Sequence, residues 1–127
     1  MRFFFLAAQS SVGLSFEQPA ETPESIILGA LNMLEALRFL GKPIKLYHAS
    51  SSECFGDLGQ QAATEDAPFR PRSPYAIAKA SAHWLVANYR EAYSGEWQKV
   101  FTFEQNQCSR SFRITVHVRP ERVFTLP

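Results

Sequence analysis

Two short apolar segments separated by a helical pattern constrain the fold of this chain more than any other feature. Residues Arg2 to Ala8 are a nearly all-apolar run, the type of strand that is buried on both faces of a parallel sheet, and Ile44 to Ala49 are expected to form a second buried strand. Between them, apolar residues from Ile27 to Leu40 recur at helical spacing. Strand, helix and strand in this order predict a parallel βαβ unit with a right-handed crossover, and therefore an α/β fold.

The boundaries of the expected elements follow ordinary start and stop signals. Thr22 is a good N-cap with Pro23 at the first helical position, and Gly41 ends the helical pattern. A second helix is expected from Tyr75 to about Tyr93. The segment from Gln9 to Pro19 is expected to be a polar loop. A longer loop is expected from Ser50 to Pro74, and loops of such length are more often functional than not.

Composition limits the kind of protein. The 127 residues suit one domain, and 46% hydrophobic residues allow a packed core. The net charge of +1 gives no electrostatic footprint for nucleic acid or an anionic membrane, and no apolar run is long enough for a membrane span. The βαβα pattern occupies residues 1–95. Residues 96–127 have no clear period, with at most one strand near Ile114–Val118.

The cysteines and the first residues suggest a compartment. Cys54 and Cys108 lie far apart without metal-ligand spacing, and the three histidines show none either, so no metal site is expected. A reducing, cytoplasmic compartment is predicted, with Cys54 as a small buried hydrophobe. Met1 to Ala8 weakly resembles a secretory signal, but its apolar part is shorter than the usual length of about 7–15 residues. A buried strand explains the same residues better.

Tyr75 and Lys79 form the first pair of candidate catalytic residues. They are four residues apart, so on a helix they lie on one face. A nearby ammonium favours the phenolate and lowers the pKa of the phenol toward that of a general base. The pair alone also fits an aromatic residue of an amphipathic helix with a solvated lysine beside it.

Ser51 and Glu53 form the second candidate pair, directly after the second expected strand. Ligands of parallel α/β sheets bind beyond the carboxyl ends of the strands, where Gln9 and Ser10 also follow the first strand. Glu53 also fits a surface acid, and Ser51 a turn residue. The two pairs together provide the groups needed to move protons on a sugar while a nicotinamide cofactor changes its redox state.

Four runs in order and with matching spacing point to a family. They are Leu6-Ala7-Ala8-Gln9-Ser10-Ser11-Val12, His48 to Gly56, Pro68 to Lys79, and Ala87 to Tyr93. Over about residues 3 to 94 the chain resembles the GDP-mannose 4,6-dehydratases, which are extended short-chain dehydrogenases/reductases. The resemblance implies a partial Rossmann-like parallel sheet. Residues 1–95 would be the C-terminal part of its NADP-binding domain, and residues 96–127 a divergent tail.

The resemblance also implies roles for the candidate residues. NADP would contact Leu6, Ala7, Ala8, Gln9, Ser10, Tyr75 and Lys79. Tyr75 would take the proton of the 4-hydroxyl of GDP-mannose, while Glu53, helped by Ser51, would remove the C5 proton and protonate the departing 6-hydroxyl. The products would be GDP-4-keto-6-deoxymannose and water. Glu53 favours dehydration, since the related 4-epimerases lack this glutamate.

Three departures from the family pattern leave other interpretations open. The family's Gly-x-x-Gly-x-x-Gly loop lies upstream of the residues present, Glu21 stands where the family usually has a cofactor-contacting tyrosine, and the Asn-His-Glu-Ser-Pro segment expected after Tyr93 is absent. The chain could therefore be an inactive truncated form or another NAD(P)-dependent nucleotide-sugar epimerase or dehydratase. It could also be an interaction module, either as a homo-oligomer or with a partner chain that supplies the missing strands.

Overall fold

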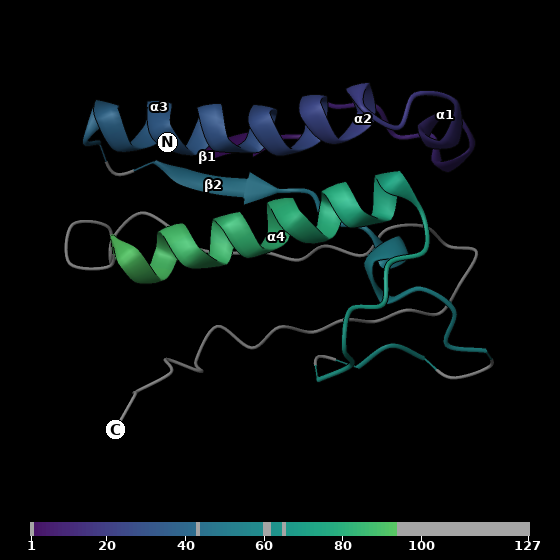
Figure 1. Ribbon diagram of the computed structural model, residues 1–127. Coiled ribbons are helices and arrows are strands. Elements are labelled where there is room, and N and C mark those ends of the chain that lie inside the picture. Colours follow the sequence, from purple (N-terminus) through teal and green to yellow (C-terminus); the bar gives the residue numbers. More distant parts are fainter. Residues whose placement is uncertain (1, 43, 60–61, 65, 94–127) are drawn as a thin grey trace.

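The computed structural model describes residues 2–42, 44–59, 62–64 and 66–93 (Figure 1). In chain order the elements are β1 (Arg2–Phe5), α1 (Val12–Glu17), α2 (Glu21–Pro23), the π-helical turn η1 (Glu24–Leu28), α3 (Gly29–Leu40), β2 (Lys45–His48), the 3-10 turn η2 (Ser52–Phe55) and α4 (Pro74–Ala92). The predicted order of strand, helix, strand, loop and helix is confirmed.

The two strands pair in parallel, with Arg2 opposite Lys45 and Phe5 opposite His48. Helices α3 and α4 lie side by side and run opposite to the strands (Figure 1). This is a βαβ unit followed by one more helix, so the α/β class is confirmed. The carboxyl ends of β1 and β2 lie at the same edge of the sheet.

The core consists of two clusters of buried residues. The strand cluster lies between the helices and the sheet and contains Leu34, Leu37, Ile44, Leu46 and Val86. The helix cluster lies where α4 packs on η1 and α3 and contains Ile26, Ala30, Tyr75, Ala78 and Ala82. The alanines present little side chain and so allow the helices to approach closely. One candidate catalytic residue, Tyr75, is thus part of the core.

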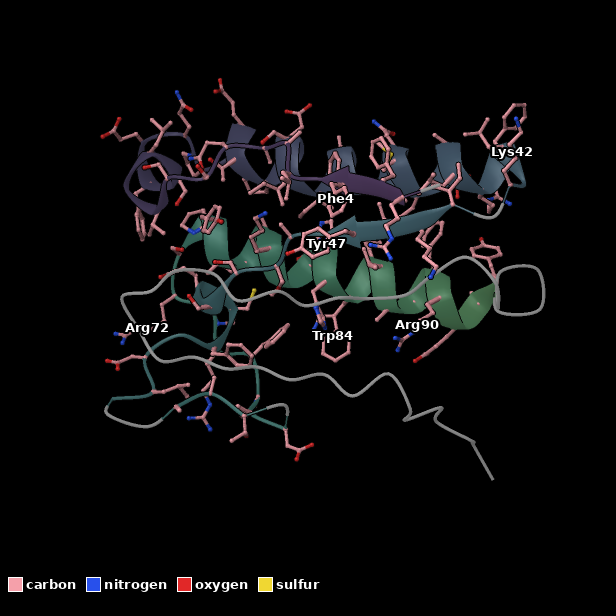
Figure 2. All side chains as sticks on the ribbon, turned by 180° about the vertical axis from the view of Figure 1, so that it is seen from behind. Phe4, Lys42, Tyr47, Arg72, Trp84 and Arg90 are labelled. Carbon is pink, nitrogen blue, oxygen red and sulfur yellow. The ribbon has the colours of Figure 1, made fainter. Side chains whose placement is uncertain are left out.

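The prediction that the first strand is buried on both faces is wrong. Successive strand residues point to opposite faces, and Phe3 and Phe5 pack against the strand cluster. Phe4 points the other way, with 59% of its surface exposed, and its ring lies 5.4 Å from that of Tyr47 (Figure 2). Within the described part of the chain, no element covers this second face of the sheet.

The predicted loop from Gln9 to Pro19 is also partly wrong, because it contains α1. Ser11 is the N-cap of this short helix, and its Oγ accepts a hydrogen bond from the backbone N–H of Leu14 at 3.2 Å. The two-turn helix is too short for its apolar period to stand out in the sequence.

The boundaries of the long helical segment are partly as predicted. It begins at Glu21, so Thr22 is not its N-cap but a buried residue of the first turn. Gly41 ends α3 in the left-handed conformation with φ 58°, as the sequence predicted. The predicted strand near Ile114–Val118 and the division between residues 95 and 96 lie outside the described residues.

Candidate active site

The start of α4 places Tyr75 and Lys79. Ser73 is the N-cap, and its Oγ accepts a hydrogen bond from the N–H of Ala76 at 3.0 Å, while Pro74 occupies the first turn. Tyr75 therefore lies in the first turn and Lys79 one turn later. Tyr75 is buried, and Lys79 is half-buried.

The Lys79 ammonium reaches the end of β2. Its Nζ donates a hydrogen bond to the backbone oxygen of Ala49 at 3.3 Å and lies 5.8 Å from the centroid of the Tyr75 ring. Burial lowers the pKa of Lys79. The N–H of Ala49 donates to the oxygen of Phe5 at 3.4 Å, so the segments that follow β1 and β2 are joined. The structure thus brings the lysine to the sheet edge where ligands of such folds bind.

The second candidate pair lies on η2, which contacts α4. Ser51 is the N-cap of this turn, and its Oγ accepts a hydrogen bond from the N–H of Glu53 at 3.3 Å. Glu53 is exposed, whereas Ser51 is half-buried. The serine therefore has a local structural role as well as its position beside the glutamate.

Two buried titratable side chains, Cys54 and His48, lie on the same elements as the candidate residues or next to them. Cys54 is fully buried, as predicted, and burial raises the pKa of its thiol. Burial, and then the charges of Lys79 and His83, lower the pKa of His48 to about 4. The imidazole at the end of β2 is therefore neutral at physiological pH.

The segment after β1 combines exposed apolar groups with a fixed amide. Leu6, Ala7 and Ser10 are exposed. Gln9 donates through Nε2 to the oxygen of Ser11 at 2.9 Å and to Thr22 Oγ1 at 3.3 Å. Its Oε1 accepts from the N–H of Ser11 at 2.7 Å, so the amide of Gln9 braces its own loop.

The described ranges contain neither a metal-ligand cluster nor a helix able to span a membrane. No group of three or more His, Cys, Asp or Glu side chains is placed there to hold a metal ion. None of the described helices combines the length and the hydropathy needed to cross a membrane.

One group beside the site has no counterpart in the sequence prediction. It is an aromatic cluster of four rings, Phe55, Phe69, His83 and Trp84. Trp84 is not a core residue, because 62% of its surface is exposed. In the sequence, the one signal for this cluster is an aromatic residue near each end of the long loop, Phe55 and Phe69. Loop residues follow no periodic pattern, so the sequence does not predict which helix residues they contact.

Solved structures define the class of fold. The chain superimposes on RMD from Pseudomonas aeruginosa, solved with NADPH, with a TM-score of 0.72 and 27% identity, over 82% of this chain and 35% of that one. It also superimposes on UDP-glucose 4-epimerase from Thermus thermophilus, solved with NAD, with a TM-score of 0.71 and 34% identity, over 82% and 32%. The fold is thus the Rossmann-like fold of the extended short-chain dehydrogenases/reductases.

Sequence comparison identifies the family. The profile described as GDP-mannose 4,6 dehydratase matches residues 3–120, and the chain belongs to this family. It is 50% identical over 90 residues to GDP-mannose 4,6-dehydratase of Vibrio cholerae, which covers 69% of this chain and 24% of that protein. It is 51% identical over 92 residues to GDP-mannose 4,6 dehydratase 1 of Arabidopsis thaliana, over 69% and 25%. The chain spans about a quarter of the length of these relatives.

Proposed function

We propose that this chain contributes the proton-transfer groups of a GDP-mannose 4,6-dehydratase, which converts GDP-mannose to GDP-4-keto-6-deoxymannose and water with NADP. One observation supports the proposal above all. Tyr75 and Lys79 on α4 and the pair Ser51 and Glu53 at η2 belong to elements that contact each other near the carboxyl ends of the parallel strands β1 and β2. The names of the relatives and the NADPH bound to RMD support the substrate and the cofactor.

In this proposal each side chain has a separate task. Tyr75 takes the proton of the sugar 4-hydroxyl, and the positive charge of Lys79 favours the phenolate. The C5 proton becomes acidic once C4 is a ketone, and Glu53 then removes it and protonates the departing 6-hydroxyl. The Ser51 hydroxyl assists Glu53 at the C6 side. The exposure of Glu53 leaves its carboxylate accessible to a substrate.

The residues of this chain are of the types that could bind the nicotinamide half of the proposed cofactor. The apolar surface of Leu6, Ala7 and Ala8, the polar groups of Gln9 and Ser10, and the Tyr75–Lys79 pair border the same sheet edge, where the nicotinamide and its ribose would bind. When bound, the nicotinamide supplies the redox chemistry. The Gly-x-x-Gly-x-x-Gly pattern that commonly holds a pyrophosphate does not occur in the 127 residues, so the pyrophosphate needs a site formed by other residues.

A chimera tests the proposed function. The 90 matched residues of this chain replace their counterparts in the Vibrio cholerae relative, and the purified chimera is incubated with NADP and GDP-mannose. We expect formation of the 4-keto-6-deoxy sugar, with a Tyr75→Phe chimera as the matched control. A folded chimera that binds NADPH but leaves GDP-mannose unchanged would refute the proposal. Turnover of UDP-glucose in place of GDP-mannose would favour an epimerase instead.

A second candidate function is an interaction module, favoured by the exposed outer face of the sheet. Phe4 and Tyr47 form an aromatic pair with tilted rings there, and strand edges invite pairing with further strands. The occupant would be a second copy or a partner chain. The mass of the full chain in solution tests this function: a dimer that Phe4→Ser dissociates would support self-association, and a monomer would exclude it.

We also propose a reducing, cytoplasmic location for the protein. It is supported by the buried Cys54, whose thiol is free. Cell fractionation with an antibody against the chain tests the location, and recovery with secreted or membrane fractions would contradict it.

A further inference from the structure

We propose that Phe69 is a positioning residue, whose ring clamps η2 to α4 and so holds Glu53 in a fixed place relative to Tyr75. The inference rests on the proposed function in one respect, since it takes Glu53 as a proton-transfer group. The geometry itself does not depend on that assignment.

The carboxylate of Glu53 has little support of its own. Among the residues that the structure describes, no hydrogen bond or ion pair holds its side chain, which is exposed. Its location therefore depends on the backbone of η2. That backbone is fixed by a hydrogen bond from the N–H of Gly56 to the oxygen of Glu53 at 3.1 Å.

The loop returns across η2 directly beside Glu53. The N–H of Arg70 donates to the oxygen of Cys54 at 2.9 Å. Gly56 has φ +69°, and a Cβ at this position would lie 2.1 Å from the backbone oxygen of Arg70. Only glycine permits this approach, so the crossing brings the residues around Arg70 into direct contact with the turn that carries Glu53.

The ring of Phe69 extends this crossing to the helix. It meets the edge of Phe55 on η2 with centroids 5.1 Å apart, and on α4 it meets His83 at 5.0 Å and Trp84 at 5.9 Å. Distances and tilted geometries of this kind are those of favourable aromatic pairs. Trp84 projects from α4 on the side away from the strands (Figure 2). One ring thus contacts the elements that carry both candidate pairs.

Amide hydrogen exchange in the full 127-residue chain tests the proposal. The reporters are the N–H of Gly56, which closes η2 on the oxygen of Glu53, the N–H of Arg70, which joins the loop to the oxygen of Cys54, and the N–H of Ala82 in the middle of α4. In Phe69→Leu we expect the first two to exchange about tenfold faster and Ala82 to be unchanged, because a local opening loses the free energy of one or two aromatic pairs. Phe69→Tyr keeps the ring and should restore the wild-type rates.

The control is Leu34→Ala, which removes a fully buried side chain of the strand cluster. We expect it to accelerate exchange at Ala82, which reports on global unfolding. If Phe69→Leu accelerates all three amides equally, Phe69 only stabilises the fold and the proposal is wrong. Unprotected Gly56 and Arg70 amides in the wild-type chain would overturn it as well.

A second variant decides the matter if Phe69→Leu does not fold. Trp84 is largely exposed, so Trp84→Ala removes one partner of Phe69 with little loss of buried surface. Faster exchange at Gly56 supports the clamp, and an unchanged rate there refutes it. Since none of these rates depends on turnover, an inactive chimera would refute the proposed function without affecting this result.

Discussion

At the scale of single residues, the four candidate side chains have unequal structural support. Tyr75 belongs to the helix cluster, and Lys79 is tied to the oxygen of Ala49. Glu53 relies on the backbone of its turn, to which Ser51 contributes a cap. Substitutions at the two pairs should therefore differ in what they disturb.

Tyr75 and Lys79 are expected to act as one unit in the chimera. Tyr75→Phe removes the base for the 4-hydroxyl and should lower kcat/KM by about 10²–10⁴-fold. Lys79→Met should have a similar effect, and the double variant should be little worse than either single variant, since residues that act together are not additive. Steady-state kinetics of the three variants provide the measurement. Multiplicative losses would contradict the pairing.

Glu53→Gln in the chimera should separate the two stages of the reaction. The amide keeps the shape of the side chain but cannot take a proton, so C4 should still be oxidised while water is not lost. The assay is incubation with GDP-mannose in deuterated water, with NADPH absorbance and deuterium at C5 as the readouts. We expect some NADPH and almost no C5 exchange. Normal C5 exchange would show that another group is the base.

The sequence indicated some of these candidate residues and not others for a physical reason. Tyr75 and Lys79 were visible because a helix places residues four apart on one face. Glu53 was visible because it directly follows a strand. Phe69 lies in a loop, where position depends on tertiary contacts and no periodic pattern exists.

At the scale of secondary structure, the sequence predicted the order of elements better than their exposure. Apolar strand residues usually indicate burial, yet Phe4 is exposed because the described elements cover only one face of the sheet. Thr22 has the chemistry of an N-cap, but the helix begins before it and its hydroxyl accepts a hydrogen bond from Gln9 instead. Tertiary contacts overrode a local preference at both positions.

Helix α3 provides a matched pair of substitutions. Leu34 is fully buried in the strand cluster, so Leu34→Ala should lower the free energy of unfolding by about 2–5 kcal/mol. Phe39 lies on the same helix with 92% of its surface exposed, so Phe39→Ala should change it by less than about 0.5 kcal/mol. Urea unfolding followed by circular dichroism measures both. Similar losses in the two variants would contradict the described packing of α3.

At the scale of the whole molecule, burial of basic side chains couples the stability of the fold to pH. Burial is the main cause of a lowered pKa at His48, His83 and Lys79. His48 lies at the carboxyl end of β2, and the Lys79 ammonium reaches the same point from α4. The same burial that sets the environment of the candidate site therefore makes the folded chain sensitive to acid.

Stability should fall as the pH drops from about 6.5 toward 4. In the unfolded chain His48 takes up a proton below its ordinary pKa of 6.5, whereas in the folded chain its pKa is lowered to about 4. The unfolded state thus binds more protons in this window, which costs roughly 3 kcal/mol of stability by pH 4 and nothing above pH 6.5. His83, whose pKa is also lowered, adds to the loss in the same direction.

Urea unfolding of the full chain at intervals between pH 4 and 7.5 measures this dependence. His48→Gln removes the titrating group, so the variant should lose less stability on acidification than the wild type, and the remaining slope should shrink again in the double variant with His83→Gln. Because both side chains are replaced by a neutral polar group, a general loss of packing would lower stability equally at every pH. A wild-type profile that is flat between pH 4 and 6.5, or a slope that His48→Gln leaves unchanged, would show that the imidazole of His48 is protonated without cost in the folded chain, and hence that the end of β2 is open to water.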